Sequence, residues 1–319
     1  MSETSATMKR NQHFGTIVKA LSGYYYVQPD QPLVDIGYDM KSVQCRARGV
    51  FKKRGLTPLV GDKVQFSLTE NGEGTVDELL PRSSQLIRPP VANIDLVVLV
   101  FSVIEPSLNT QLLDKFLVHI EHAEIKPILC LSKEDLQQQE GAQANEAKEA
   151  IATIHQIYSK LGYEIYDTSA TEQTGVAELK ERLQGHIAVF AGQSGVGKSS
   201  LLNQLVPGLN LETSAISQRL GRGKHTTRHV ELIDIDGGWV ADTPGFSQLD
   251  FAQLGVEDLS YCFVEMRERA GDCKFRGCTH VQEPGCAVIA GVQAGSIAME
   301  RYEHYKIFLQ EMNDSKRRY

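Results

Sequence analysis

The pattern of apolar and polar positions along the chain changes near residue 86. Before that point no helical run is visible, and short β segments follow one another between turn residues. Strands at this density predict a small closed barrel of the oligonucleotide-binding (OB) type over residues 13–85. Residues 1–12 are polar and are expected to form a disordered tail. The five β segments are Gly15–Ala20, Tyr24–Val27, Val43–Ala47, Val60–Phe66 and Gly74–Leu79.

From residue 86 to about residue 250, apolar runs alternate with helical stripes. Leu96–Phe101 is apolar throughout, which predicts a buried strand, and Leu112, Phe116 and Ile120 mark one face of the helix that follows. The alternation predicts a doubly wound α/β domain with helices on both faces of its sheet. Further strands are expected at Pro127–Leu131, Tyr163–Tyr166 and Ile187–Phe190, with helices around residues 151–161 and 176–183.

A glycine-rich stretch in this domain, GQSGVGKSS, follows the strand Ile187–Phe190 and precedes a helical run at Leu201–Leu205. Strand, turn and helix in this order, with Gly-x-x-x-x-Gly-Lys-Ser, predict a phosphate-binding loop for a nucleoside triphosphate. Lys198 is expected to reach the terminal phosphates, and Ser199 to be a ligand of Mg²⁺. A chance glycine-rich turn would not carry all the fixed residues and both flanks. The phosphate-binding residues are therefore Gly192, Gln193, Ser194, Gly195, Val196, Gly197, Lys198, Ser199 and Ser200.

Two short motifs upstream end predicted strands, where such folds bind ligands. In the first, Ser132, Lys133, Glu134 and Asp135, the carboxylate of Asp135 is placed to accept hydrogen bonds from the ring N–H and exocyclic amine of guanine. In the second, Ser169 and Ala170 follow a strand and can present a backbone N–H to the guanine carbonyl. The tetrapeptide alone could be an ordinary polar turn, and the second motif alone is a weak signal.

Two motifs downstream suit Mg²⁺ and the γ-phosphate. The loop of residues 221–227 contains Thr226 and Thr227, either of which could bind Mg²⁺. Asp242 would hold Mg²⁺ through water, and the N–H of Gly245 would sense the γ-phosphate. The residue just after this glycine is Phe246, which cannot orient water by hydrogen bonding.

Residues 251–319 are expected to form a mostly α-helical zinc-binding domain, which contains a cluster of potential metal ligands and a predicted helix near Ile297–Leu309. Three cysteines and a histidine within fourteen residues suit tetrahedral Zn²⁺, and four protein ligands leave no open position, so the site should be structural. Cys45, Cys130 and Cys262 stand singly and are expected to be buried thiols. The ligands are Cys273, Cys278, His280 and Cys286.

The five nucleotide motifs occur in the order base, base, phosphate, switch, switch, which resembles the circularly permuted GTPases. With a barrel before and a Cys/His cluster after, the chain resembles the ribosome small-subunit-dependent GTPase A family (RsgA, also called YjeQ). The resemblance implies a GTPase that binds the small (30S) ribosomal subunit and its 16S rRNA in late maturation or checkpointing and leaves after hydrolysis. It raises the case for the zinc ligands and points to His225 as catalytic. Ser132 stands where the family usually has Asn, so its effect on guanine affinity stays open.

The composition and charge of the chain indicate its cellular location and the extent of any nucleic-acid contact. Apolar residues make up 41% and charged residues 23% of 319 residues, which is ordinary for a soluble protein, and no apolar run could span a membrane. The polar amino terminus lacks a secretion signal, so a cytoplasmic location is expected. No pattern indicates a dimer interface, so a monomer is expected. The net charge of −7 argues against a general nucleic-acid coat. Six Lys or Arg residues between Lys41 and Arg54, beside Tyr24–Tyr26 and Phe51, nevertheless form either an RNA-facing strip or a solvated face.

Three functions fit these motifs. The favoured one is a GTPase that binds the small subunit with GTP, hydrolyses it to GDP, and then leaves. The alternative is a GTP-controlled RNA-binding switch without ribosome-stimulated catalysis, which Phe246 favours. An ATP-using P-loop enzyme is opposed by Asp135, which adenine cannot satisfy.

Overall fold

The computed structural model describes residues 12–33, 41–69, 72–86, 90–138, 142–206, 208–209, 230–242, 251 and 254–316. The contacts divide the chain into two units that do not follow the order of the sequence. Unit 1 holds residues 1–95, 185–189 and 223–244, and unit 2 holds residues 96–184, 190–222 and 245–319. Residues 1–11, most of the expected disordered tail, lie outside the described residues, and Gln12 already belongs to the first strand.

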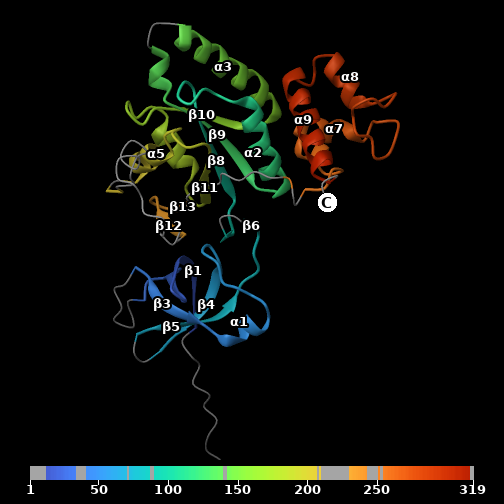
Figure 1. Ribbon diagram of the computed structural model, residues 1–319. Helices are drawn as coiled ribbons and strands as arrows, with labels where there is room; N and C mark the ends of the chain where they lie inside the picture. The colour runs from blue at the N-terminus through green and yellow to red at the C-terminus, as the bar shows by residue number, and fades with distance from the viewer. Residues whose placement is uncertain are drawn as a thin grey trace, which may run out of the picture. The chain divides into compact units, whose positions relative to one another are not determined.

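Unit 1 contains a closed five-stranded barrel, which confirms the barrel prediction (Figure 1). Antiparallel pairing joins β1 to β2 and β4, β2 to β3, and β4 to β5, and a parallel pairing of β3 with β5 completes the ring. Alternate side chains fill the interior, and Ile17, Val64 and Phe66 are fully buried there. The strands are β1 (Gln12–Leu21), β2 (Tyr24–Pro29), β3 (Val43–Ala47), β4 (Lys63–Leu68) and β5 (Gly74–Leu79).

One expectation for the barrel was wrong, because a short helix, α1 (Gly49–Lys53), follows β3. Five residues are too few to show a helical period in sequence. The helix buries Phe51, which is only 5% exposed, so this ring is part of the core and cannot serve an RNA-facing strip. After the barrel, β6 (Gln85–Leu86) and β7 (Val91–Ala92) form a small hairpin that the sequence pattern did not reveal.

Unit 1 also includes strands from the second half of the chain. The strand β12 (Glu231–Asp234) pairs antiparallel with β13 (Trp239–Asp242), and β13 pairs in parallel with the first residues of β11 (Ile187–Ala191). Lys19 of β1 lies opposite Glu231 of β12, and their side chains form an ion pair of 2.7 Å. The barrel is thus continuous by hydrogen bonding with the strand that leads to Asp242.

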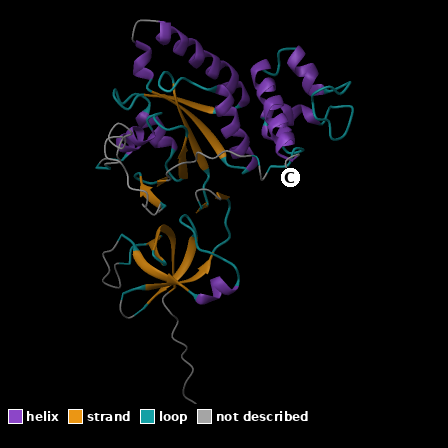
Figure 2. Cartoon of the chain, viewed as in Figure 1, coloured by secondary structure: helices purple, strands orange, loops and turns teal. Residues whose placement is uncertain are grey.

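Unit 2 contains a parallel sheet with helical crossovers, as the alternating pattern predicted (Figure 2). Every residue of β8 (Leu96–Ser102) is buried, as expected for a strand covered on both faces. The strand β9 (Lys126–Ser132) lies between β8 and β10 (Glu164–Thr168). The crossover helices are α2 (Thr110–His122), α3 (Ala142–Tyr158) and α4 (Val176–Arg182), and α5 (Lys198–Leu205) packs against α4.

The C-terminal part of unit 2 is mostly helical, as predicted (Figure 1). Its core includes Phe263, Met266, Val288 and Phe308, each fully buried. Ile297 is buried but precedes the last helix, which begins two residues later. The elements are the 3-10 turn η4 (Leu259–Cys262), α7 (Val264–Ala270), α8 (Ala287–Gln293) and α9 (Met299–Lys316).

A buried ionic network joins this C-terminal part to the parallel-sheet part within unit 2. Arg301 of α9, which is 1% exposed, donates to Asp114 of α2 and, at 2.5 Å, to Glu265 of α7. Asp114 also accepts from Tyr158 at 2.8 Å and contacts His304 Nδ1 at 2.6 Å. A buried charge is tolerated when every donor and acceptor is paired, so removing any one member should be costly. Among the described residues, no helix is both long and apolar enough to cross a membrane.

Candidate nucleotide and metal sites

The predicted phosphate loop lies between the end of β11 and the start of α5. Its three glycines adopt positive φ angles, 141° at Gly192, 85° at Gly195 and 95° at Gly197. A side chain at Gly192 would place its Cβ 2.2 Å from the carbonyl oxygen of Val100, which is impossible without moving the backbone. The loop therefore needs glycine for its conformation and for its close packing on β8.

Lys198, at the first turn of α5, is folded back onto this loop. Its Nζ donates to the carbonyl oxygens of Gly192 at 2.8 Å and Gln193 at 2.5 Å. Burial of the ammonium lowers the pKa of Lys198 to about 8, because a desolvated cation is disfavoured. An anion placed inside the loop would restore the lost charge compensation, so the arrangement favours phosphate binding.

Ser132, the residue that departs from the usual Asn, lies under the phosphate loop. Its hydroxyl is 2.5 Å from the carbonyl oxygen of Val196 and 3.2 Å from that of Phe101, and the residue is 5% exposed. A hydroxyl carries one proton, so the shorter contact, to Val196, is the hydrogen bond that we assign. Ser132 thus links the end of β9 to the loop.

The two base-reading motifs meet in space. The Oδ1 of Asp135 accepts a hydrogen bond of 2.6 Å from the hydroxyl of Ser169, and that hydroxyl also accepts from the N–H of Glu172 at 3.0 Å. Ser169 is fully buried, and Ala170 next to it is partly exposed. Burial, and then the nearby carboxylates of Asp167, Glu172 and Asp135, raise the pKa of Glu134. Several carboxylates therefore lie close together here, and their oxygens can accept hydrogen bonds from the N–H donors of a base.

A segment beside this site was missed in the sequence. Glu105, just after β8, accepts a hydrogen bond through its carbonyl oxygen from the Nζ of Lys133. Pro106, which follows a cis peptide bond, has its Cδ 4.0 Å from where a Cβ of Gly195 would be. The signal was available, because the segment leaves the carboxyl end of a buried parallel strand, where ligands bind in such sheets.

Several predicted residues cannot be placed. His225, Thr226, Thr227, Gly245 and Phe246 lie outside the described residues. The backbone of Asp242 is described, as the last residue of β13 opposite Glu231, but its side chain is not.

The four predicted metal ligands come together. The ligand atoms of Cys273, Cys278, His280 and Cys286 all lie within 4.8 Å of one another. The Sγ atoms of Cys273 and Cys286 are 3.9 Å apart, and His280 Nδ1 lies 3.6 Å and 3.3 Å from them. Tetrahedral Zn²⁺ with bonds of about 2.3 Å to sulfur and about 2.0 Å to nitrogen requires ligand separations of about 3.8 Å and 3.6 Å. The donor set therefore fits a metal ion.

The surroundings of these ligands also suit a metal. Backbone N–H groups of Ala287 and Ile289 lie 3.4 Å from the Sγ atoms of Cys273 and Cys286, where they would stabilise thiolates. His280 is 2% exposed, and Tyr302 donates to its carbonyl oxygen at 2.7 Å. Three of the four ligands, Cys273, Cys286 and His280, are thus supported by contacts from neighbouring residues.

Two of the six cations in the basic strip of the barrel, between Lys41 and Arg54, are engaged with neighbouring side chains. Arg46 lies over the ring of Tyr24, 4.6 Å from its centre, and Arg48 forms an ion pair of 2.5 Å with Asp77. The remaining cations are exposed: Lys41, Lys52, Lys53 and Arg54. An exposed cation beside an aromatic ring is compatible with nucleic-acid contact and equally with solvent.

Comparisons with known proteins agree with the permuted motif order. The RsgA GTPase family model matches residues 79–252, and the RsgA N-terminal domain model matches residues 14–76. The small ribosomal subunit biogenesis GTPase RsgA of Bacillus cereus is 51% identical over 305 residues, 96% of this chain and 99% of that protein. The protein of the same name from Bacillus subtilis is 48% identical with the same coverage.

Two solved structures are similar over nearly the whole chain. YloQ, described as a circularly permuted GTPase, is 40% identical with a TM-score of 0.81, covering 98% of this chain and 99% of YloQ. YjeQ from Thermotoga maritima is 35% identical with a TM-score of 0.80, covering 94% of this chain and 99% of that one. The permuted GTPase fold predicted from the motif order is confirmed, and the chain belongs to the RsgA GTPase family.

Proposed function

We propose that the protein is a GTP hydrolase that binds the small ribosomal subunit, acts in its late maturation or checkpointing, and leaves after hydrolysis. The observation that carries the proposal is the meeting of Asp135 and Ser169 in the unit that holds the phosphate loop. A carboxylate at that position accepts from guanine and is not satisfied by adenine. The relatives of this protein from Bacillus cereus and Bacillus subtilis are named as GTPases of small ribosomal subunit biogenesis.

The nucleotide would be held at its two ends by separate parts of the site. The backbone N–H groups of Gly192–Ser200 would surround the phosphates, and Lys198 would exchange the loop carbonyls for phosphate oxygens. Asp135, supported by Ser169, would read the guanine edge, and the backbone of Ala170 would serve the guanine carbonyl. Ser132 would not contact the nucleotide and would instead position the phosphate loop through its hydrogen bond to the carbonyl oxygen of Val196.

Mg²⁺ would supply charge neutralisation between the β- and γ-phosphates. Ser199, in the first turn of α5, offers the hydroxyl that this loop type uses for the ion. Asp242 and one of Thr226 and Thr227 are the other proposed ligands. His225 is the proposed catalytic residue, because Phe246 cannot orient water; His225→Ala with unchanged turnover and GTP affinity would reject this assignment.

We further propose that the Cys/His cluster holds one structural Zn²⁺. Its support is the near-tetrahedral spacing of the Cys273, His280 and Cys286 ligand atoms, the presence of Cys278 within 4.8 Å of them, and the N–H groups directed at two sulfurs. The protein would act as a cytoplasmic monomer, alternating between GTP and GDP. Its exposed barrel cations would contact 16S rRNA.

The test is GTP turnover measured with and without purified small subunits, with large subunits as the matched control. We expect stimulation by small subunits only, and weak competition by ATP for GTP binding. A rate that stays flat with small subunits would favour the alternative, a GTP-controlled RNA-binding switch. Equal competition by ATP would reject the guanine assignment of Asp135.

A further inference from the structure

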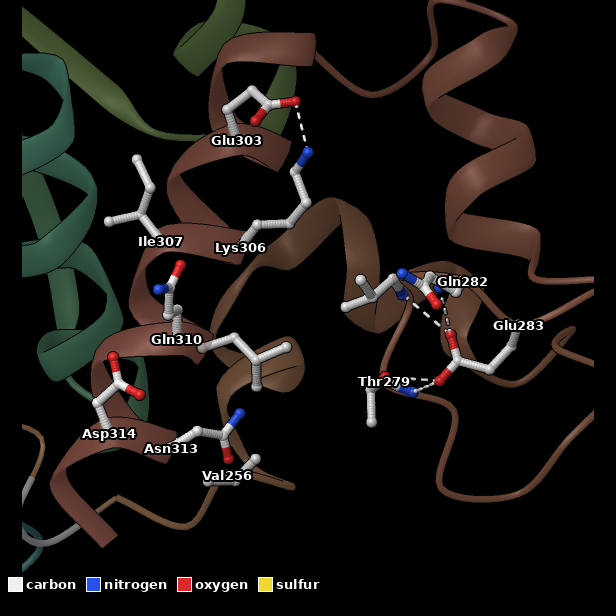
Figure 3. Close-up of a pocket in the computed structure, with 12 residues that line it drawn as sticks. Val256, Thr279, Gln282, Glu283, Glu303, Lys306, Ile307, Gln310, Asn313 and Asp314 are labelled. Atoms are coloured by element: carbon white, nitrogen blue, oxygen red, sulfur yellow. Dashed lines mark hydrogen bonds and ion pairs between the residues drawn. The ribbon is translucent and has the colours of Figure 1, made fainter. Parts of the chain in front are cut away.

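A groove of about 970 Å³ lies on the C-terminal helical part, between α9 and the loop that carries the metal ligands (Figure 3). One wall is a face of α9, and the other is the segment of residues 279–283. The volume is at the upper end of ordinary ligand pockets, which is enough for a short peptide segment. The side chains that decide its character are Val281, Gln282, Glu303, Ile307, Gln310 and Asp314.

Each wall of the groove presents a large apolar side chain to solvent. Ile307 on α9 is 43% exposed, and Val281 on the loop is 37% exposed. Leu309 and Val256 add apolar lining. Exposed apolar groups gathered in a hollow mark an interaction site, whereas scattered ones do not.

The polar lining is acidic. Three carboxylates and one ammonium line the groove, which gives a formal charge of −2, and the ammonium of Lys306 is already paired with Glu303 at 2.7 Å. Asp314 has no ion-pair partner among the described residues. Such a lining repels phosphate groups and attracts cations. The charge therefore favours a basic protein segment over RNA.

We propose that this groove binds an extended, basic segment of a partner protein. Glu303 and Asp314 are eleven residues apart on α9, which corresponds to about 16 Å along the helix. An extended chain covers that distance in about five residues. The segment would thus carry two Lys or Arg side chains five positions apart, with apolar residues between them against Ile307 and Val281. The amides of Gln282 and Gln310 would pair with its main chain.

The loop wall is held by a hydrogen-bond cap that lies inside the metal loop. Glu283 accepts from the N–H groups of Thr279 at 2.7 Å, Val281 at 3.0 Å and Gln282 at 3.1 Å. These residues lie between the proposed ligands Cys278 and Cys286. The groove would therefore need the metal loop to be folded, whereas the residues proposed to bind GTP lie outside this loop.

The first test is fluorescence anisotropy on the full chain with a labelled, end-capped hexapeptide, Arg-Leu-Pro-Val-Leu-Arg. We expect saturable binding that weakens at least about tenfold when both arginines are replaced by glutamate or are placed two positions apart. No saturable binding, or equal binding of the glutamate peptide, would overturn the proposal. Competition by a ten-uridine RNA as strong as that by unlabelled peptide would point to RNA and would also overturn it.

The second test uses variants of the groove. Ile307→Asn, which removes the apolar contact without adding charge, and Asp314→Lys should each weaken peptide binding about tenfold. The control Glu268→Lys makes the same charge change as Asp314→Lys at an exposed position of α7 and should change binding less than about twofold. Basal GTP turnover and hydrogen exchange across residues 254–316 should stay unchanged in all three variants, which shows that the nucleotide site and the C-terminal part both fold and keeps the result independent of the proposed GTPase function. Equal binding by all three, or concentration-dependent dimers of the unmodified chain that the peptide disperses, would reject a peptide partner.

Discussion

The nucleotide loop and the metal cluster are both small sites built from a tight loop, but their polar groups are used differently. Lys198 is paired with carbonyl oxygens of its own loop and is partly desolvated, so a ligand can replace those partners. In the cluster, the ligand atoms of Cys273, His280 and Cys286 lie close to tetrahedral separations, with that of Cys278 within 4.8 Å, and backbone N–H groups are directed at two of the sulfur atoms. The first arrangement suits exchange of a ligand and the second suits permanent retention. Stability should therefore depend on the metal, and activity on the loop.

The largest expected effect comes from removing a metal ligand. Cys278→Ser should abolish metal retention and expose amide hydrogens across residues 254–316, because structural zinc contributes on the order of 10 kcal/mol to folding. The measurements are metal content per chain and hydrogen exchange. Cys262→Ala is the matched control, since it removes a buried thiol of the same region that is not a ligand. A Cys278→Ser protein that keeps one metal per chain and unchanged hydrogen exchange would show that the cluster is not a structural metal site of this kind.

The next effect concerns the loop. Lys198→Ala should lower GTP turnover about 10²- to 10³-fold, as expected when a preorganised phosphate donor is lost. Thermal stability should change little, because the buried ammonium gains little from its own loop. Lys160→Ala, on an exposed lysine of the same unit, should have no effect on turnover. If Lys198→Ala lowered the melting temperature as much as metal removal did, the loop would be a structural element and the contrast would fail.

Local patterns in the sequence were enough to predict the loop and most of the sheet. The apolar run Leu96–Phe101 predicted a strand buried on both faces, and the strand-end rule brought Asp135 and Ser169 together across 34 residues. The buried Arg301 could not be predicted. An arginine in a helix with mixed polarity reads as a solvated residue, and its partner Asp114 lies 187 positions away. Only the packing of α9 on α2 shows that this charge is inside.

The pH dependence of GTP binding should sharpen the view of Lys198 as an exchangeable partner. The pKa of Lys198 is lowered to about 8 in the free protein, and phosphate would raise it in the complex. GTP affinity should be highest well below pH 8, where Lys198 is already protonated in the free protein. It should fall above pH 8, because Lys198 must then take up a proton when GTP binds. The expected loss is about tenfold at pH 9. Titration calorimetry in buffers of different ionisation enthalpy would measure the proton uptake, and Lys198→Arg should remove it.

The smallest effect on nucleotide affinity should come from substituting Ser132, which stands where the family usually has Asn. The substitution tests whether the hydrogen bond from Ser132 to Val196 supports the phosphate loop. Ser132→Ala leaves the carbonyl oxygen of Val196 without its 2.5 Å partner, at a cost of about 1–2 kcal/mol. GTP affinity should fall about fivefold to tenfold, and GDP affinity should fall equally, since both nucleotides use the same loop. Ser132→Thr should restore both, because it keeps the hydroxyl. A loss of guanine selectivity over adenine, measured by ATP competition, would instead show that Ser132 contacts the base. A variant that no longer folds would show that Ser132 is needed for the structure of the domain. Equal weakening of GTP and GDP with intact selectivity is what a residue acting through Val196 requires.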